Sequence, residues 1–514
     1  MFKNWTLGTA KSKPLSILLL FICVQGITGQ RAIAQKSATL PSSLIAQKSP
    51  SKAQSLPAIC SAQLGGAIDA VINRPQFQRF RWGILVEPVS GSGTLYARDR
   101  DRYFIPASNT KLFTTAAALS KLGSNYRIRT SIYNASSDPN IKSLRLVGRG
   151  DPSLTDPQLR ELAQQLKRQG YDQIQQLVVD DGYFQGTQIN PSWEWEDVQY
   201  YYGTTVNSLI LNQNAIGLTI SPQKPGLPLK VSWNDPISAI SWQVENNSVT
   251  SAPGSESSVQ LNSFLGKPVL QISGQLAADA QPNLQAMAVI DPAETFSRHL
   301  RVALAGQQIK VANTQVVATK NTDNGKELAA VESPPLATLL AETNQSSNNL
   351  YAEALLRLLG ATNKELAANN QDTAEIGLAT VKQTLTNLGV DPESYKLVDG
   401  SGLSRHNLVS PNAIVQTLKA MAKSPYAEYY RASLPIAGVS GTLKTRLRNT
   451  PAQGMLLAKT GTMTGVVALS GYLNAPINQP LVFSILVNQS DQSASVMRQA
   501  MDEIVLLLTR VRTC

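Results

Sequence analysis

The chain has 514 residues, of which 42% are hydrophobic and 16% charged, and its formal net charge is +11. This length and apolar content suit two or three domains with large cores and exclude general disorder. It has only two histidines, His299 and His406, and three cysteines, which excludes a histidine-rich metal centre, a four-cysteine zinc site and a fully cysteine-ligated iron–sulfur cluster. We therefore expect neither a metal ion nor a cofactor.

Residues 1–34 have the features of a secretory signal peptide. Three lysines precede an apolar run from Leu15 to Val24, and Ala32-Ile33-Ala34 is typical of a cleavage site. An apolar run of ten residues is too short for a permanent membrane helix, although an uncleaved anchor is the alternative. We expect an exported protein of the periplasm or cell envelope.

Residues 35–56, rich in Ser, Ala, Lys and Pro, predict a flexible linker. Once the signal is removed, Cys60 and Cys514 remain near the two ends of the chain. Two such thiols can pair as a disulfide in an oxidising compartment, and two free thiols are the alternative.

A folded pattern begins at Pro57. The sequence predicts a helix over Cys60 to Ile72, strands over Phe80 to Glu87 and Thr94 to Ala97, and a helix over Ser108 to Leu122. Apolar or small residues dominate the last of these helices, which indicates burial in the middle of a domain.

Residues 132–330 have short β-like runs, many Asn, Ser, Pro and Gly, and few long helices apart from Asp156 to Gly170. This pattern predicts an inserted β-rich region of one or two subdomains. Helical patterning returns over Pro334 to Leu359 and over Thr373 to Leu388.

The C-terminal part predicts an antiparallel meander and a final helix. The strands are expected over Gly454 to Gly461, Val466 to Asn474 and Leu481 to Asn488. Apolar residues recur at helical spacing over Ser493 to Arg512, so this helix is expected to pack on the sheet.

The first motif is Ser108-Asn109-Thr110-Lys111, at the start of the buried helix. Residues three apart share a helix face, so Lys111 is within reach of the Ser108 hydroxyl. A serine needs a base to become a nucleophile, and a lysine acts as one when burial and a neighbouring positive charge depress its pKa. A helix-start serine with a solvated lysine is the alternative.

The second motif is Ser347-Asn348-Asn349, ahead of a helix from Leu350 to Leu359. A hydroxyl and an amide two residues apart at a helix entrance can point into one cleft. Taken alone, the motif is equally typical of an N-cap cluster.

The third motif is Lys459-Thr460-Gly461-Thr462, at the end of an apolar strand. A glycine lets a substrate backbone approach the strand edge closely, and Lys459 would supply the second positive charge that keeps Lys111 neutral. The alternative is an ordinary strand that ends in a glycine turn.

In this order the three motifs resemble the signature of penicillin-binding proteins and serine β-lactamases. Further segments resemble one group, the D-alanyl-D-alanine carboxypeptidase/endopeptidase family of low-molecular-mass class C penicillin-binding proteins. These segments are Gly148 to Leu154 (GRGDPSL), Asp399 to Arg405 (DGSGLSR), Gly438 to Leu443 (GVSGTL) and Leu469 to Tyr472 (LSGY). The resemblance runs from Pro57 to the C-terminus. Arg149 and Ser440 depart from it, since the family often has glycine and aspartate there.

The resemblance implies an α+β fold, with a β-lactamase/transpeptidase-like domain whose antiparallel five-stranded sheet is flanked by helices. Residues 57–131 plus 331–514 would form this penicillin-binding (DD-peptidase) domain, and residues 132–330 would be a large β-rich insertion. The implied partners are peptidoglycan stem peptides and β-lactams. The scattered basic residues give no support to nucleic-acid binding.

The resemblance also implies roles for the three motifs. Ser108 would attack the carbonyl between two D-alanines to form an acyl-enzyme, with Lys111 as general base. Backbone N–H groups of Ser108 and Thr462 would form the oxyanion hole. Ser347 would relay a proton to the leaving amine, and Asn349 would orient Lys111 and the substrate. The residues implied to hold the terminal carboxylate are Lys459, Thr460 and Thr462, with Gly461 between them.

Trp193 to Tyr202, a segment with five aromatic residues, resembles the part of the family that reads the stem-peptide side chain. The far end of diaminopimelate is a zwitterion, so Asp197 suits its ammonium group and Arg405 its carboxylate. Trp195, Tyr202 and Met463 would wall this pocket. An ordinary aromatic cluster with surface charges is the alternative.

Two other functions remain open. A serine β-lactamase would need a group to hold the deacylating water, and no class A Glu-x-x-Leu-Asn motif is convincing here. A non-catalytic envelope-binding protein would be expected to lack at least one of the motifs, yet all three are intact.

Overall fold

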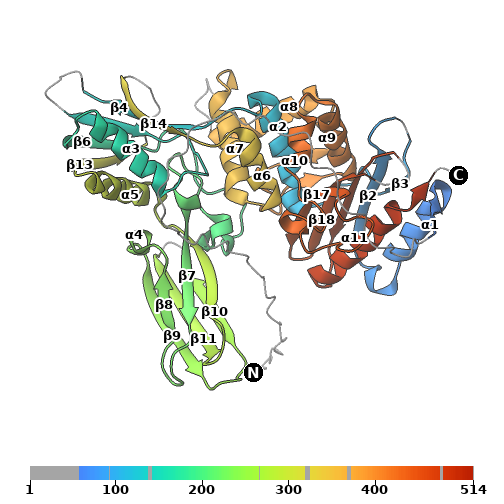
Figure 1. Ribbon diagram of the computed structural model, residues 1–514. Helices are drawn as coiled ribbons and strands as arrows, with labels where there is room; N and C mark the ends of the chain where they lie inside the picture. Colours follow the sequence, from blue (N-terminus) through green and yellow to red (C-terminus); the bar gives the residue numbers. More distant parts are fainter. Residues whose placement is uncertain are drawn as a thin grey trace, which may run out of the picture. The chain divides into compact units, whose positions relative to one another are not determined.

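An antiparallel five-stranded sheet joins early and late parts of the chain in the computed structural model (Figure 1). Its strand order is β17-β18-β19-β2-β3. The strands are β2 (Arg81–Pro88), β3 (Tyr96–Arg98), β17 (Leu456–Met463), β18 (Val466–Leu473) and β19 (Leu481–Asn488). This sheet, together with the helices around it, confirms the predicted α+β fold class.

The structure describes residues 57–91, 93–136, 142–264, 267–318, 325–366, 372–474, 479–512 and 514. The predicted signal peptide (1–34) and linker (35–56) lie outside these residues. Among the described residues, no helix is both long and apolar enough to cross a membrane.

Helices pack on both faces of the sheet, because alternate strand residues point to opposite sides. On β18, Leu469 belongs to the core shared with α1 (Ser61–Ile72) and α11 (Ala494–Leu508). The preceding residue, Ala468, belongs to the core on the opposite face. Because both faces of β18 are buried, nearly all of its residues are apolar or small.

The helix α2 (Lys111–Leu122) lies within the second core, and its residues from Lys111 to Leu119 are all buried. This confirms the predicted burial. The longer helices in contact with α2 are α6 (Leu336–Gln345), α7 (Asn349–Thr362), α8 (Thr373–Asn387) and α9 (Pro411–Lys423). The short elements nearby are α10 (Ala427–Ala432), β15 (Tyr395–Lys396) and β16 (Leu408–Val409).

Three predicted helices have different bounds. Ser108 lies in a 3₁₀ turn, η2 (Ala107–Thr110), and the α-helix starts only at Lys111. The pattern from Pro334 to Leu359 is two helices, α6 and α7, because the chain turns at Ser347, whose φ is +59°. The last helix ends at Leu508.

Beyond α11, β20 (Val511–Arg512) pairs in parallel with β1 (Ile59–Cys60). This pairing replaces the predicted last helical turn, since the backbone N–H of Ile59 donates to the carbonyl of Arg510. Cys60 and Cys514 form a disulfide beside these strands.

Residues between Arg129 and Glu332 form three further sheets with cores of their own. One has the order β13-β6-β5-β4-β14. Its elements are β4 (Arg129–Asn134), β5 (Ser143–Val147), β6 (Gln173–Asp180), β13 (Lys310–Val317) and β14 (Glu327–Glu332), with α3 (Asp156–Arg168) and α5 (Pro292–Gly306). The long helix α5 was not anticipated from the sequence.

The other two sheets have three strands each, in the orders β12-β7-β8 and β10-β11-β9. They comprise β7 (Ala215–Ser221), β8 (Lys230–Trp233), β9 (Gln243–Ser251), β10 (Ser258–Ser263), β11 (Val269–Ala277) and β12 (Asn283–Ala288), with the short helix α4 (Pro236–Ala239). The proposed domain bounds at 131/132 and 330/331 fall inside β4 and β14, and the division into domains stays a prediction.

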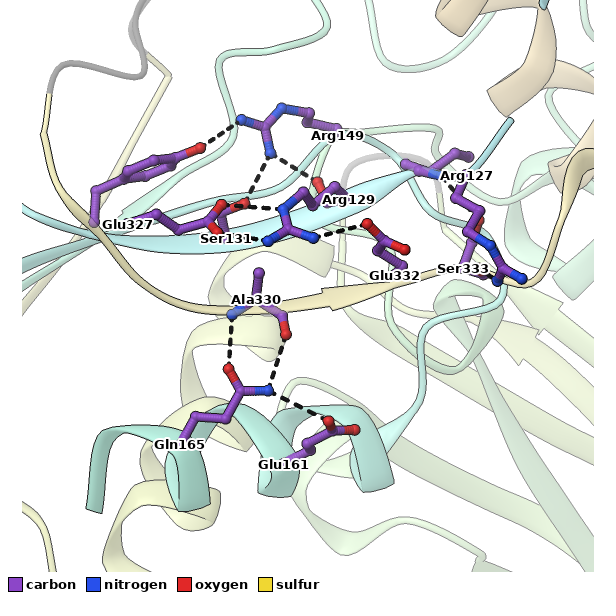
Figure 2. A network of polar contacts seen from close by, with 12 residues as sticks. Arg127, Arg129, Ser131, Arg149, Glu161, Gln165, Glu327, Ala330, Glu332 and Ser333 are labelled. Atoms are coloured by element: carbon purple, nitrogen blue, oxygen red, sulfur yellow. Dashed lines mark hydrogen bonds and ion pairs between the residues drawn. The ribbon is translucent and has the colours of Figure 1, made fainter. Parts of the chain in front are cut away.

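A polar network joins β4 and β14, the strands on which the chain leaves and returns (Figure 2). Arg129 on β4 forms ion pairs with Glu327 and Glu332 on β14. Arg149, a departure from the family pattern, donates to the carbonyl of Arg129 at 2.8 Å. The Arg149 side chain thus contacts the backbone of β4 directly.

Candidate active site

Ser108 and Lys111 meet at the start of α2. In a 3₁₀ turn residues i and i+3 eclipse one another, which places the Nζ of Lys111 3.0 Å from the Oγ of Ser108. Ala107, directly before the serine, has a φ of +47°, a left-handed conformation that is unfavourable for alanine. Ser108 stays partly exposed, whereas Lys111 is fully buried.

The ammonium group of Lys111 has two further partners at 2.7 Å. These are the Oδ1 atom of Asn349, from the second motif, and the backbone carbonyl of Ser401. Burial lowers the pKa of Lys111 to about 7, while the carboxylates of Asp399 and Glu353 act in the opposite direction. At neutral pH a substantial fraction of Lys111 is therefore an uncharged amine.

The second and third motifs meet through Lys459. Its Nζ lies 2.8 Å from the Oγ of Ser347 and 2.8 Å from the carbonyl of Thr460. Burial lowers the pKa of Lys459 well below its usual value, and the charge of Lys111 lowers it further. Of the two causes expected from the sequence, burial is the one that lowers the pKa of Lys111, and the charge of Lys459 is not among its causes.

Polar side chains line the outer strand of the sheet, β17. The hydroxyl oxygens of Thr460 and Thr442 are 2.7 Å apart, and the Oγ1 of Thr462 accepts from Arg498 at 3.0 Å. Gly461 lies between Thr460 and Thr462, and a Cβ on it would be 2.8 Å from the carbonyl oxygen of Pro106. The turn before Ser108 therefore approaches Gly461 closely enough to require glycine there.

Two carboxyl groups outside the three motifs hold the loop that contacts Lys111. The Oε1 of Glu353 on α7 accepts from the backbone N–H groups of Gly400 (2.9 Å) and Ser401 (2.8 Å). Asp399 accepts from Trp193 Nε1 at 3.0 Å and from the backbone of Ser404 at 2.7 Å. A lone acid in a largely apolar helix was the signal for Glu353.

The aromatic segment of residues 193–202 reaches the same site. The Nδ2 of Asn349 donates to the carbonyl of Tyr202 at 2.8 Å. Tyr202 stacks against Tyr200, with ring centroids 5.6 Å apart. Trp195 is 56% exposed, and Met463 lies half-buried at the end of β17.

Asp197 and Arg405 lie in one charged neighbourhood with Glu194. The Nε of Arg405 is 3.8 Å from Glu194 Oε1, so the nearest ion pair involves a residue that the prediction omitted. Burial raises the pKa of Asp197, whereas a hydrogen bond from Tyr202 and the charge of Arg405 act to lower it.

Neither histidine contacts the motifs. His299 is buried between Asp156 (2.7 Å) and Asp235 (3.1 Å), and His406 is exposed. The described part of the chain contains no group of His, Cys, Asp and Glu side chains arranged to hold a metal ion.

Comparisons with known proteins identify relatives along most of the chain. Residues 64–511 match the model of the D-Ala-D-Ala carboxypeptidase 3 (S13) family. The chain is 33% identical over 439 residues to a D-alanyl-D-alanine carboxypeptidase of Actinomadura sp. (strain R39), covering 82% of this chain and 80% of that protein. It is 28% identical to D-alanyl-D-alanine carboxypeptidase DacB of Haemophilus influenzae, covering 79% and 85%.

A solved structure has the same fold. The crystal structure of penicillin binding protein 4 (dacB) from Haemophilus influenzae superposes with a TM-score of 0.74 at 24% identity, covering 86% of this chain and 98% of that one. A second structure of that protein, in complex with a β-lactam, gives a TM-score of 0.69 at 22% identity, covering 87% and 98%.

Proposed function

Because the chain belongs to the D-Ala-D-Ala carboxypeptidase 3 (S13) family, we propose that Ser108 is the nucleophile with which this serine peptidase trims terminal D-Ala from peptidoglycan and cuts D-Ala–diaminopimelate cross-links. One observation carries the assignment: the Ser108 hydroxyl lies 3.0 Å from a fully buried lysine amine. Partly exposed, Ser108 is open to a substrate.

The contacts of Lys111 suit a general base. A neutral amine has two N–H donors and one lone pair, and the oxygens of Asn349 and Ser401, each at 2.7 Å, accept both donors. The lone pair is then left for the proton of Ser108. As that proton moves to Nζ, Ser108 Oγ bonds to the carbonyl carbon of the D-Ala–D-Ala peptide.

The developing negative charge on the substrate oxygen needs hydrogen-bond donors. Backbone N–H groups of Ser108 and Thr462 would supply them, at about 3 kcal/mol for each donor. Ser347, held by Lys459 at 2.8 Å, would pass a proton to the nitrogen of the departing D-alanine. Water then attacks the acyl-enzyme and regenerates Ser108.

The side-chain pocket would be built from Asp197 and Arg405. Their opposite charges lie in one neighbourhood, as the zwitterionic end of diaminopimelate requires. Trp195, Tyr202 and Met463 would form its walls, and Tyr202 is the member tied directly to Asn349.

We also place the protein in the periplasm or cell envelope, where peptidoglycan lies. The disulfide between Cys60 and Cys514 supports an oxidising compartment. Without residues 1–34, which hold four basic residues and no acid, the net charge is still +7 (11 − 4), which suits an acidic envelope polymer.

The test is intact and peptide mass spectrometry after exposure to benzylpenicillin, beside Ser108→Ala. A lasting single adduct on the Ser108 peptide, absent from the variant, is expected. Rapid hydrolysis of penicillin without an adduct would instead indicate a β-lactamase. Folded protein that gives neither would overturn the mechanism and indicate an envelope-binding role.

A further inference from the structure

We propose that Arg498, on α11, binds the carboxylate of the leaving D-amino acid and makes the enzyme select substrates whose carboxylate is free. The inference rests on the proposed function and extends it to a residue outside the three motifs. It stands on the contact of Arg498 with β17 and on the charges around its guanidinium group.

Arg498 reaches the substrate edge of the sheet through Thr462. Its Nη2 donates to the Oγ1 of Thr462 at 3.0 Å. Thr462 is exposed and shares a strand face with Thr460, because residues two apart point the same way. The guanidinium therefore lies at the end of the row of hydroxyls, Thr442, Thr460 and Thr462, beside which the leaving residue would lie.

Arg498 has no carboxylate within ion-pairing distance among the residues that the structure describes. The nearby acid is Asp502, which pairs with Arg446 through both of its oxygens, at 2.7 and 3.2 Å. Burial lowers the pKa of Arg498, the charge of Arg446 lowers it further, and Asp502 opposes both. A half-buried cation beside another cation is stabilised by an incoming anion.

The alternative cation, Lys459, is less suited to hold the carboxylate alone. Its Nζ is already in contact with Ser347 and with the carbonyl of Thr460. A guanidinium group has five N–H donors and stays protonated at any physiological pH. Arg498 can therefore donate to Thr462 and to a carboxylate at the same time, and its planar shape suits a two-point contact.

The experiment compares two peptides that share one scissile bond, an acyl-D-Ala-D-Ala acid and its C-terminal carboxamide. For Arg498→Gln we expect kcat/KM on the acid to fall on the order of tenfold to a hundredfold, the usual range for one lost charged hydrogen bond. The carboxamide should change less than about threefold on the same scale. Arg498→Lys, which keeps the charge, should retain part of the preference for the acid.

The matched control is Arg448→Gln, an equal loss of charge at an exposed arginine whose Nε contacts the carbonyl of Lys444. It should leave the ratio of the two rates unchanged. Titration with benzylpenicillin counts the folded active sites of each variant. An equal loss on both peptides, or no loss, in Arg498→Gln would overturn this inference alone. Wild-type protein that cleaves neither peptide and takes up no penicillin would instead overturn the proposed function.

Discussion

The Nζ of Lys111 lies 2.7 Å from the backbone carbonyl of Ser401, a residue 290 positions later in the chain. This carbonyl belongs to a loop that Glu353 holds through two backbone N–H groups. The orientation of the lysine therefore depends on a buried carboxylate that does not contact it directly.

The rate of acylation should depend on the protonation of Lys111. Its pKa is lowered to about 7, and only the neutral amine can accept the proton of Ser108. We expect the second-order rate of acylation by a chromogenic β-lactam to rise with pH through about 7 and then level off. A rate that is constant from pH 5 to pH 9 would contradict this role for the lysine.

Glu353→Gln should move the acid limb of that profile to lower pH. The charged form of Glu353 favours the protonated form of Lys111, so its loss lowers the pKa of the lysine. Burial raises the pKa of Glu353 itself to about 7, so only part of it is charged on the acid limb and the shift is small. The glutamine carbonyl can still accept from Gly400 and Ser401, which keeps the loop in place. Glu365→Gln, at an exposed position, is the control. An unshifted limb with reduced rates at every pH would indicate a structural role only.

Gly461→Ala should slow acylation by about a hundredfold, the scale for a misplaced reacting group. The new Cβ would lie 2.8 Å from the carbonyl of Pro106 and 3.1 Å from the Cβ of Ala107, which displaces the turn that carries Ser108. Gly66→Ala, on α1, meets no atom within 4 Å and should leave the rate unchanged. Stopped-flow measurement with the same β-lactam separates the two, and equal rates would refute the packing argument.

Cys514→Ser should lower the free energy of unfolding by about 2–5 kcal/mol while acylation of the folded protein stays normal. The disulfide joins residues 454 positions apart, so the unfolded chain gains much freedom without it. Urea denaturation followed by tryptophan fluorescence measures the loss. A reductant should shift the wild type by a similar amount and the variant not at all; a wild type insensitive to reduction would count against the prediction.

Much of the fold and of the reacting groups could be predicted from the sequence. The strands β17 to β19 are rich in apolar residues and lie between turn residues, and apolar or small residues dominate α2, so the local pattern alone indicated a buried helix and a meander. Ser108 and Lys111 are close because they lie three positions apart, one helical turn, whatever the rest of the chain does. The order of the three motifs, together with further segments such as Asp399 to Arg405, identified the family.

Only the tertiary structure decided how these groups are held. Asn349, Ser401 and Lys459 are far apart in the chain, and their meeting depends on how α7, the loop after Asp399 and β17 pack around α2. The pKa of Lys111 follows from that burial, which no local pattern expresses. Likewise, Arg498 contacts Thr462 because α11 packs against the sheet. The two residues are 36 positions apart, and this spacing does not reveal which helix residue will reach the strand edge.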